Sequence, residues 1–193
     1  MPGFWQPGYL PAMTVARKTF IGSTTNAGVA IPADNATAQV FGIWNPAGSG
    51  IIIIPVRLTV AAATTGSTVV AALGLSALYN TGSQVATGSP ITAFTQTSSL
   101  PGMIGDAAGA AGMSQGKFTL SATMTAPTFV YDLGMATTAG TATTTSAPPA
   151  LNWGVFDFTG AIGIAPGTYV GLGGSAAPGS TFQGSIEWME IPV

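Results

Sequence analysis

The sequence contains neither cysteine nor histidine in its 193 residues. Without cysteine the chain has no disulfide bridge and no thiolate chemistry. Without histidine it lacks the commonest acid–base catalyst, most zinc and iron ligand sets, and any serine–histidine nucleophile. The sequence therefore predicts a protein that is not an enzyme, with no catalytic residue, no metal site and no cofactor.

Charged residues are also scarce, at 5% of the chain, whereas an average soluble domain has about 25%. The net charge is −2, and the basic residues Arg17, Lys18, Arg57 and Lys117 form no basic patch. We therefore expect no nucleic-acid partner. Because a free monomer usually needs surface charge, and 47% of the residues are hydrophobic, we predict an obligate homo-oligomer, with a trimer as the expected form.

Targeting and nucleotide-binding signals are missing as well. The N-terminal stretch MPGFWQPGYLPAM has neither a basic region nor an apolar region typical of a signal peptide. The run IIIIPVRLTV is interrupted by Pro55 and Arg57, and it is shorter than the roughly 20 apolar residues of a spanning helix. The stretch NPAGSGIIII lacks the lysine of a phosphate-binding loop. We expect synthesis in a cytosol and no membrane partner.

Strand-like stretches separated by turn signals run along most of the chain. They are residues 13–21, 36–44, 51–62, 68–79, 91–97, 117–125, 128–133, 153–159, 167–172 and 181–191. The stretch 68–79 is rich in alanine and leucine, so a buried helix is the alternative there, but Gly74 and the absence of charge argue against a surface helix. The pattern predicts an all-β fold, an antiparallel β-sandwich expected to be a jelly roll, formed by residues 13–193 as a single domain.

Two stretches predict which side chains face the core, because strand side chains alternate between faces. In 51–62 one face is wholly apolar and the other becomes polar toward its end: Ile52, Ile54, Val56, Leu58 and Val60 against Ile51, Ile53, Pro55, Arg57 and Thr59. Pro55 cannot donate to a ladder, which indicates a sheet edge or a bulge. In 117–125 we expect an inward and an outward set: Phe118, Leu120, Ala122 and Met124 inward; Thr119, Ser121, Thr123 and Thr125 outward.

Residues 1–12 are predicted to form an extended N-terminal arm. Three prolines keep this segment extended, and it carries large apolar side chains that either pack on the arm's own domain or dock on a neighbouring subunit. Large aromatics elsewhere are expected to be core or interface anchors. The candidate interface residues are Phe4, Trp5, Tyr9, Leu10, Trp44 and Trp188.

The acidic residues offer one candidate catalytic pair. Two carboxylates can hydrolyse a glycosidic bond, and Asp132 in VYDL and Asp157 in VFDF are the pair to test. The alternative is that each caps a strand or accepts hydrogen bonds from backbone amides, which we favour because isolated acids do not make a catalytic constellation. Glu187 and Glu190 are three residues apart, so on a regular strand they face opposite ways.

Two stretches, IWNPAGSGIIIIPVRLTV and GIAPGTYVGLGGSAAPGSTFQGSIEWMEIPV, resemble virion proteins of tailed bacteriophages. The pattern WNPAGSG before an apolar strand, and an ending of the form aromatic–x–Glu–hydrophobic–Pro, are similar to those of small capsid-associated proteins. The resemblance implies a jelly-roll domain that assembles as a trimer and decorates or cements the head shell. The implied partner is the major capsid protein, and the implied location is the capsid surface of the virion after synthesis in the host cytoplasm.

Tail-fibre tips share this composition, so a receptor- or glycan-binding tip domain of a phage tail fibre or spike is the alternative function. A fibre protein should carry a repetitive shaft or a coiled-coil segment. The sequence shows neither, which favours capsid decoration.

Overall fold

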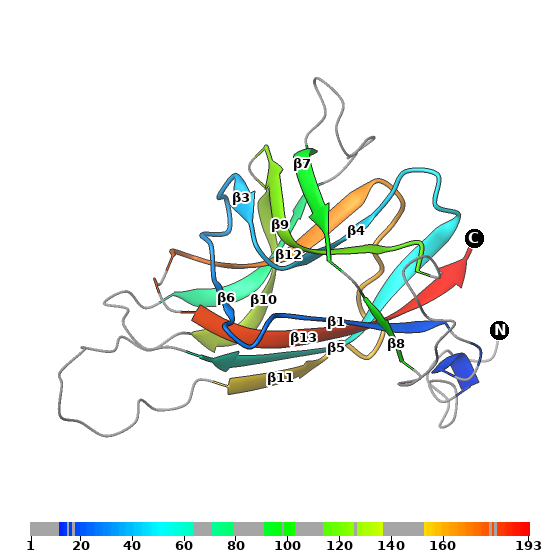
Figure 1. Cartoon of the computed structure of the whole chain (residues 1–193), viewed down its shortest axis with the longest axis horizontal. Helices are drawn as coiled ribbons and strands as arrows, with labels where there is room; N and C mark the ends of the chain where they lie inside the picture. The colour runs from blue at the N-terminus through cyan, green and yellow to red at the C-terminus, as the bar shows by residue number, and fades with distance from the viewer. Residues whose placement is uncertain are drawn as a thin grey trace.

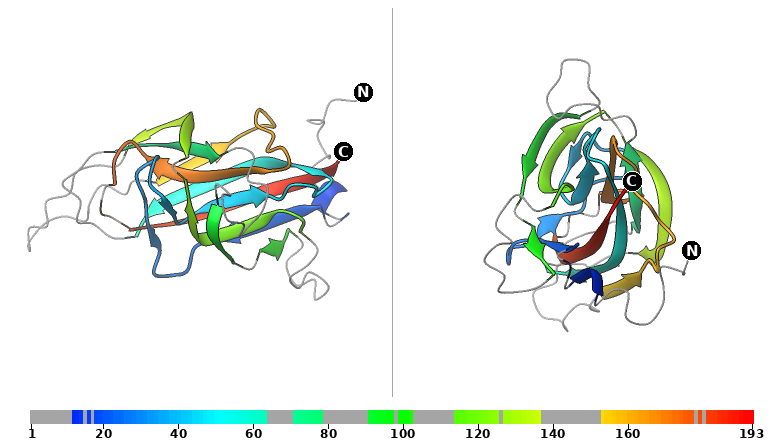
Figure 2. Two further views of the ribbon diagram at one scale, coloured as in Figure 1. Left: turned by 90° about the horizontal axis from the view of Figure 1, so that it is seen from above. Right: turned by 90° about the vertical axis from the view of Figure 1, so that its right-hand side faces the viewer.

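The computed structural model describes residues 12–14, 16, 18–63, 71–78, 91–97, 99–102, 114–125, 127–136, 153–177, 179 and 181–193. Within these residues the chain forms two antiparallel β-sheets, here called sheet A and sheet B, that pack against each other (Figures 1 and 2). The predicted all-β sandwich is confirmed, and the jelly-roll connectivity stays a prediction.

Sheet A contains the longest strand pair of the described residues. The strands lie in the order β11 (Trp153–Asp157), β5 (Ile51–Ala62), β13 (Thr181–Pro192), β1 (Thr19–Ser23) and β8 (Leu100–Pro101), and β2 (Val29–Ala30) also pairs with β13. The pairing of β5 with β13 extends from Ile51 opposite Pro192 to Ala62 opposite Phe182. This pair therefore ties the middle of the chain to its C-terminal strand (Figure 1).

Sheet B lies across the core from sheet A. Its strands run in the order β10 (Thr128–Ala136), β6 (Ala72–Leu78), β12 (Thr168–Gly174), β4 (Gly42–Asn45), β9 (Lys117–Met124) and β3 (Ala38–Gln39), and β7 (Ile91–Gln96) pairs with β9. The stretch 68–79 thus contains a strand rather than the alternative helix. The apolar residues that alternate along β6 and β12 build one wall of the core.

The prediction of a strand over 13–21 is wrong at its start. Residues 12–14 form a helical turn, and the N–H of Lys18 donates to the carbonyl oxygen of Met13 at 2.9 Å. Strand β1 begins only at Thr19, where the chain pairs with β13. The candidate interface residues Phe4, Trp5, Tyr9 and Leu10, and with them the predicted arm up to residue 11, lie outside the described residues.

A β-bulge in β5 corrects the predicted faces of this strand. The register passes from Arg57 opposite Glu187 to Pro55 opposite Trp188, so Val56 is an extra residue on β5. Because a bulge shifts the alternation by one residue, the β5 side chains in the main core are Ile51 and Ile53 before it and Leu58 and Val60 after it. The prediction that Ile52 and Ile54 share a face with Leu58 is wrong.

The same bulge explains how a proline is accommodated inside the sheet. Strand β11 pairs with β5 only from Ala61 to Arg57, so Pro55 has a ladder partner on the β13 side alone, and the register shift beside it confirms the bulge alternative. The carbonyl oxygen of the extra residue, Val56, accepts a hydrogen bond from the N–H of Phe158 at 2.9 Å. Phe158, which lies outside the regular ladder, thus provides a hydrogen-bond donor for the backbone carbonyl group next to the proline.

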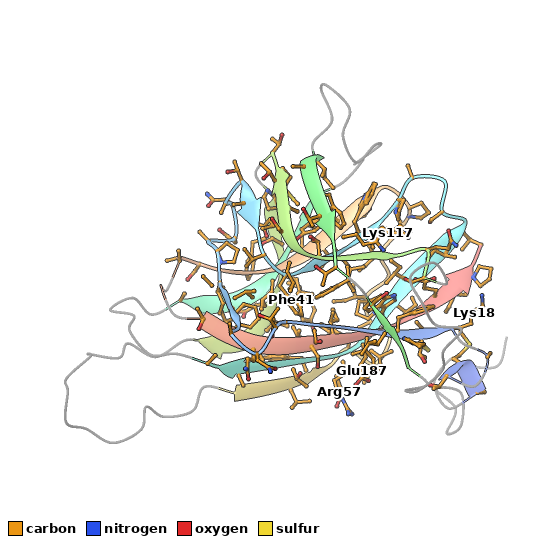
Figure 3. The ribbon with its side chains drawn as sticks, in the orientation of Figure 1. Lys18, Phe41, Arg57, Lys117 and Glu187 are labelled. Carbon is orange, nitrogen blue, oxygen red and sulfur yellow. The ribbon has the colours of Figure 1, made fainter. Side chains whose placement is uncertain are left out.

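Aromatic side chains link the two sheets through the main core. The ring centroid of Phe41 lies 5.3 Å from that of Phe118 and 5.7 Å from that of Phe182, both at steep angles. Trp188 stacks on Phe118 at 6.4 Å and also contacts Phe20 at 5.9 Å. Figure 3 places Phe41 between the sheets. These five rings contribute dispersion and burial from both sheets at once, which stabilises their packing.

A second hydrophobic cluster lies on the outer face of sheet B. Trp44 and Tyr169 are opposite one another on β4 and β12, and Phe94 on β7 packs on Trp44 with ring centroids 5.5 Å apart. Thr119, predicted to face outward, is fully buried, with its Oγ1 2.6 Å from the carbonyl oxygen of Thr95. Strand β7 pairs beside β9 and supplies Phe94 to this cluster and an acceptor to Thr119, which the period-two pattern of β9 alone does not reveal.

Candidate functional site

The two described candidate interface residues lie in the interior of the chain. Trp188 is 0% exposed and Trp44 is 4% exposed. Their rings belong to the main core and to the outer cluster respectively. Of the alternatives left open for the tryptophans, the structure thus gives these two a core position within the single chain.

The candidate catalytic pair is divided between the two sheets. Asp157 on β11 of sheet A accepts a hydrogen bond from Nε of Arg57, with Nε and Oδ1 2.7 Å apart and both side chains about half exposed. Asp132 on β10 of sheet B accepts the N–H of Gly134 at 2.8 Å. Asp132 therefore accepts a backbone amide, as the non-catalytic alternative predicts, whereas Asp157 pairs with the side chain of Arg57, a partner that this alternative did not name.

Arg57 lies at the centre of a row of charges on the outer face of sheet A. It is opposite Asp157 on one side and Glu187 on the other, and Figure 3 shows Arg57 and Glu187 near each other. The hydrogen bond that Arg57 donates to Asp157, and then the charges of Asp157 and Glu187, raise the pKa of Arg57 above its usual value. The row is exposed, so it contributes little to stability.

Glu190 is a buried acid whose role the sequence analysis did not identify. It is 3% exposed. Its Oε1 accepts hydrogen bonds from Ser114 Oγ (2.5 Å), the N–H of Gly116 (2.9 Å) and Nε1 of Trp188 (3.2 Å), and its Oε2 accepts from the N–H of Gln115 (2.9 Å). The side chain thus fastens the segment before β9 to the C-terminal strand. Glu187 is less buried than Glu190, as their spacing predicted.

The turn NPAGSG is organised by its first residue. Asn45 is fully buried. Its Nδ2 donates to the carbonyl oxygens of Ile51 at 2.9 Å and Ile164 at 2.8 Å, and its Oδ1 accepts from Ser49 Oγ at 2.6 Å. The polar residues of the WNPAGSG pattern therefore have a structural role at the start of β5.

Three consecutive apolar residues on β10 are exposed to solvent. Phe129, Val130 and Tyr131, here called the β10 patch, are 37%, 45% and 42% exposed. Strand β10 is the outermost strand of the sheet B order. Its register with β6 shifts between Phe129 and Tyr131. Because bulges at an edge oppose pairing with another strand, contact at the β10 patch would be made by side chains rather than by sheet extension.

The outer face of sheet A carries an open groove of about 510 Å³. Strands β5, β11 and β13 and the residues that follow β1 line it, and none of the lining residues is charged. Serine, threonine, asparagine and glutamine side chains supply its polar groups, and Val155, which is 49% exposed, supplies an apolar one.

Comparison with known proteins identifies no relative: no protein family, no curated protein and no solved structure matches the chain. Across the described part of the chain, no group of three or more acidic side chains lies close enough together to hold a metal ion. No helix in that part is long and apolar enough to span a membrane.

Proposed function

We propose that the chain is a non-enzymatic structural protein that decorates and cements the capsid shell of a tailed phage through subunit–subunit contacts. Its partners in this proposal are further copies of itself, as a trimer, and the major capsid protein. The observation that carries the proposal is the exposed β10 patch on a chain with only 5% charged residues. The resemblance of the WNPAGSG and C-terminal stretches to capsid-associated proteins supports the phage context.

The area of the β10 patch suits the centre of an interface. A large aromatic side chain has about 150–250 Å² of surface, so the exposed fractions of Phe129, Val130 and Tyr131 amount to roughly 200–250 Å² of mostly apolar area. A standard interface buries about 800 Å² on each partner. Phe129 lies against Gly74 and is opposite Ser76, whereas Tyr131 is opposite Leu75 and contacts Phe158, so the patch extends over both faces of the β10 edge. It would form the apolar core of an interface that wraps around this edge, with a rim of neighbouring polar residues.

The acidic residues support a role without chemistry. Asp157 is paired with Arg57, Asp132 accepts a backbone N–H, and Glu190 is buried among four donors. General acid–base catalysis requires a carboxyl group within reach of a substrate. In these three positions the carboxyl groups accept hydrogen bonds from partners within the chain, and that of Glu190 is also buried.

The first test is self-association, measured by sedimentation at micromolar concentration. We expect the parent to be an oligomer and Val130→Glu to shift it toward monomer, because a charge at the patch must lose its hydration on assembly. Val155→Glu, which places the same charge on β11, is the matched control and should leave the oligomer intact. A monomeric parent, or a Val130→Glu variant that assembles like the parent, would contradict the proposal.

The second test is location. Immunogold electron microscopy of virions of the encoding phage should label the head shell. Label at the tail tip instead would support the alternative, a receptor- or glycan-binding tip domain.

A further inference from the structure

The groove on the outer face of sheet A has polar side chains that are held in place by their own neighbours. Nε2 of Gln183 donates to the carbonyl oxygen of Asn26 at 2.5 Å. The hydroxyl groups of Thr59 and Ser185 lie 2.7 Å apart, on neighbouring strands. Oγ1 of Thr24 accepts the N–H of Gly184 at 3.1 Å. These bonds fix part of the lining before any ligand arrives, which reduces the entropic cost of binding.

Other polar groups of the groove remain open to solvent. The side chains of Ser23, Thr25 and Asn26 are exposed and make no hydrogen bond to other described residues. Because Nε2 of Gln183 is engaged, its amide orientation is set and Oε1 stays available as an acceptor. Hydroxyl and amide groups both donate and accept, so the groove presents closely spaced sites of both kinds.

The chemistry of the lining selects among ligand classes. A charged ligand would find no opposite charge in the groove, because no lining residue is ionisable. A wholly apolar ligand would leave the hydroxyl and amide groups without partners. A neutral saccharide offers many hydroxyl groups that donate and accept, together with less polar C–H faces that can rest on the exposed side chain of Val155.

We propose that this groove binds a short neutral saccharide. Its volume of about 510 Å³ is within the range of roughly 300–1,000 Å³ that is usual for small-ligand sites. The side chains of Asn26 and Gln183 recognise sugar hydroxyl groups, and Val155 contacts the ring. The inference does not depend on the proposed capsid role, since the groove and the β10 patch lie on different strands of different sheets.

The test uses the full chain and a panel of neutral di- to tetrasaccharides built from glucose, galactose and N-acetylglucosamine, with sialylated and sulfated saccharides for comparison. Binding is screened on an array, and the dissociation constant of each hit is measured by calorimetry. We expect binding of at least one neutral saccharide and no binding of the acidic ones. Failure of every neutral saccharide to bind more tightly than about 1 mM, or equal binding of the acidic ones, would overturn the proposal.

Variants locate the binding. Asn26→Ala and Val155→Glu should each raise the dissociation constant at least tenfold, and both positions are exposed, so folding is preserved. Val130→Glu is the matched control and should bind the saccharide like the parent. Binding that survives both groove substitutions would overturn the assignment to this groove. If the parent binds a saccharide but sediments as a monomer, the proposed capsid role is refuted and the saccharide site is retained.

Discussion

Replacing Glu190 with glutamine tests the buried hydrogen-bond cluster most directly. The side chain keeps its size, but one acceptor oxygen becomes an NH₂ donor. If the remaining oxygen stays opposite Ser114, Gly116 and Trp188, the new donor faces the N–H of Gln115, which then has no acceptor. If the amide turns over, the N–H of Gly116 and Nε1 of Trp188 lose their acceptor instead, whereas the hydroxyl group of Ser114 can donate to the carbonyl oxygen of Gly116.

The magnitude follows from these contacts. A buried donor left without an acceptor costs about 1–3 kcal/mol, and hydrogen bonds to a charged group are stronger than neutral ones by about 1 kcal/mol each. A neutral amide does not carry the desolvation penalty of a buried carboxylate, which offsets part of this loss. We therefore expect the free energy of unfolding to fall by roughly 2–4 kcal/mol. For a chain of this size that lowers the melting temperature by about 4–16 °C.

The experiment compares urea and thermal unfolding of Glu190→Gln with the parent at pH 7 and at one protein concentration, because association also changes apparent stability. Glu187→Gln is the matched control: it lies three residues away on β13, is less buried, and should change stability by no more than about 0.5 kcal/mol. A double-mutant cycle with Ser114→Ala should show coupling of about 0.5–3 kcal/mol. Equal effects of the two glutamate substitutions, or no coupling to Ser114, would refute the reasoning.

Four further predictions address other parts of the chain. Asn45→Ala removes three hydrogen bonds and should lower the free energy of unfolding by about 2–3 kcal/mol in urea, whereas the exposed Asn26→Ala should not. Gly42→Ala places a Cβ against the hydroxyl group of the buried Tyr169 and should cost about 1–3 kcal/mol; a variant as stable as the parent would contradict this packing. Burial raises the pKa of Tyr169, so the folded state keeps a proton that the unfolded state releases, and stability should fall as the pH rises above about 10. Urea midpoints across that range should fall less in Tyr169→Phe, and an equal fall would refute the assignment. Deleting the residues before Met13 should leave the sandwich folded by thermal melting but weaken self-association by sedimentation; unchanged association would count against an arm that docks on a neighbour.

The sequence determined the class of fold and most strand positions because these depend on local pattern. The stretch 51–62 coincides with β5, and 117–125 with β9 to within one residue. Period-two alternation and β-branched residues do not need tertiary contacts to be recognised. The opposite faces of Glu187 and Glu190 followed from their spacing for the same reason, because the extra residue at the register shift between Glu187 and Trp188 lies on β5 and not on β13.

Tertiary structure alone decided which faces are buried and which polar groups are engaged. Pro55 indicated an edge or a bulge, but only the pairing with β13 chose the bulge and moved Ile53 to the core. Thr119 is buried because β7 pairs beside β9 in sheet B and places the carbonyl oxygen of Thr95 next to its hydroxyl group. The acceptor role of Glu190 depends on Ser114, which is 76 residues away. The bulge, the burial of Thr119 and the hydrogen bonds of Glu190 all depend on residues that are far apart in the chain. A short stretch of sequence does not show which distant residues will pair.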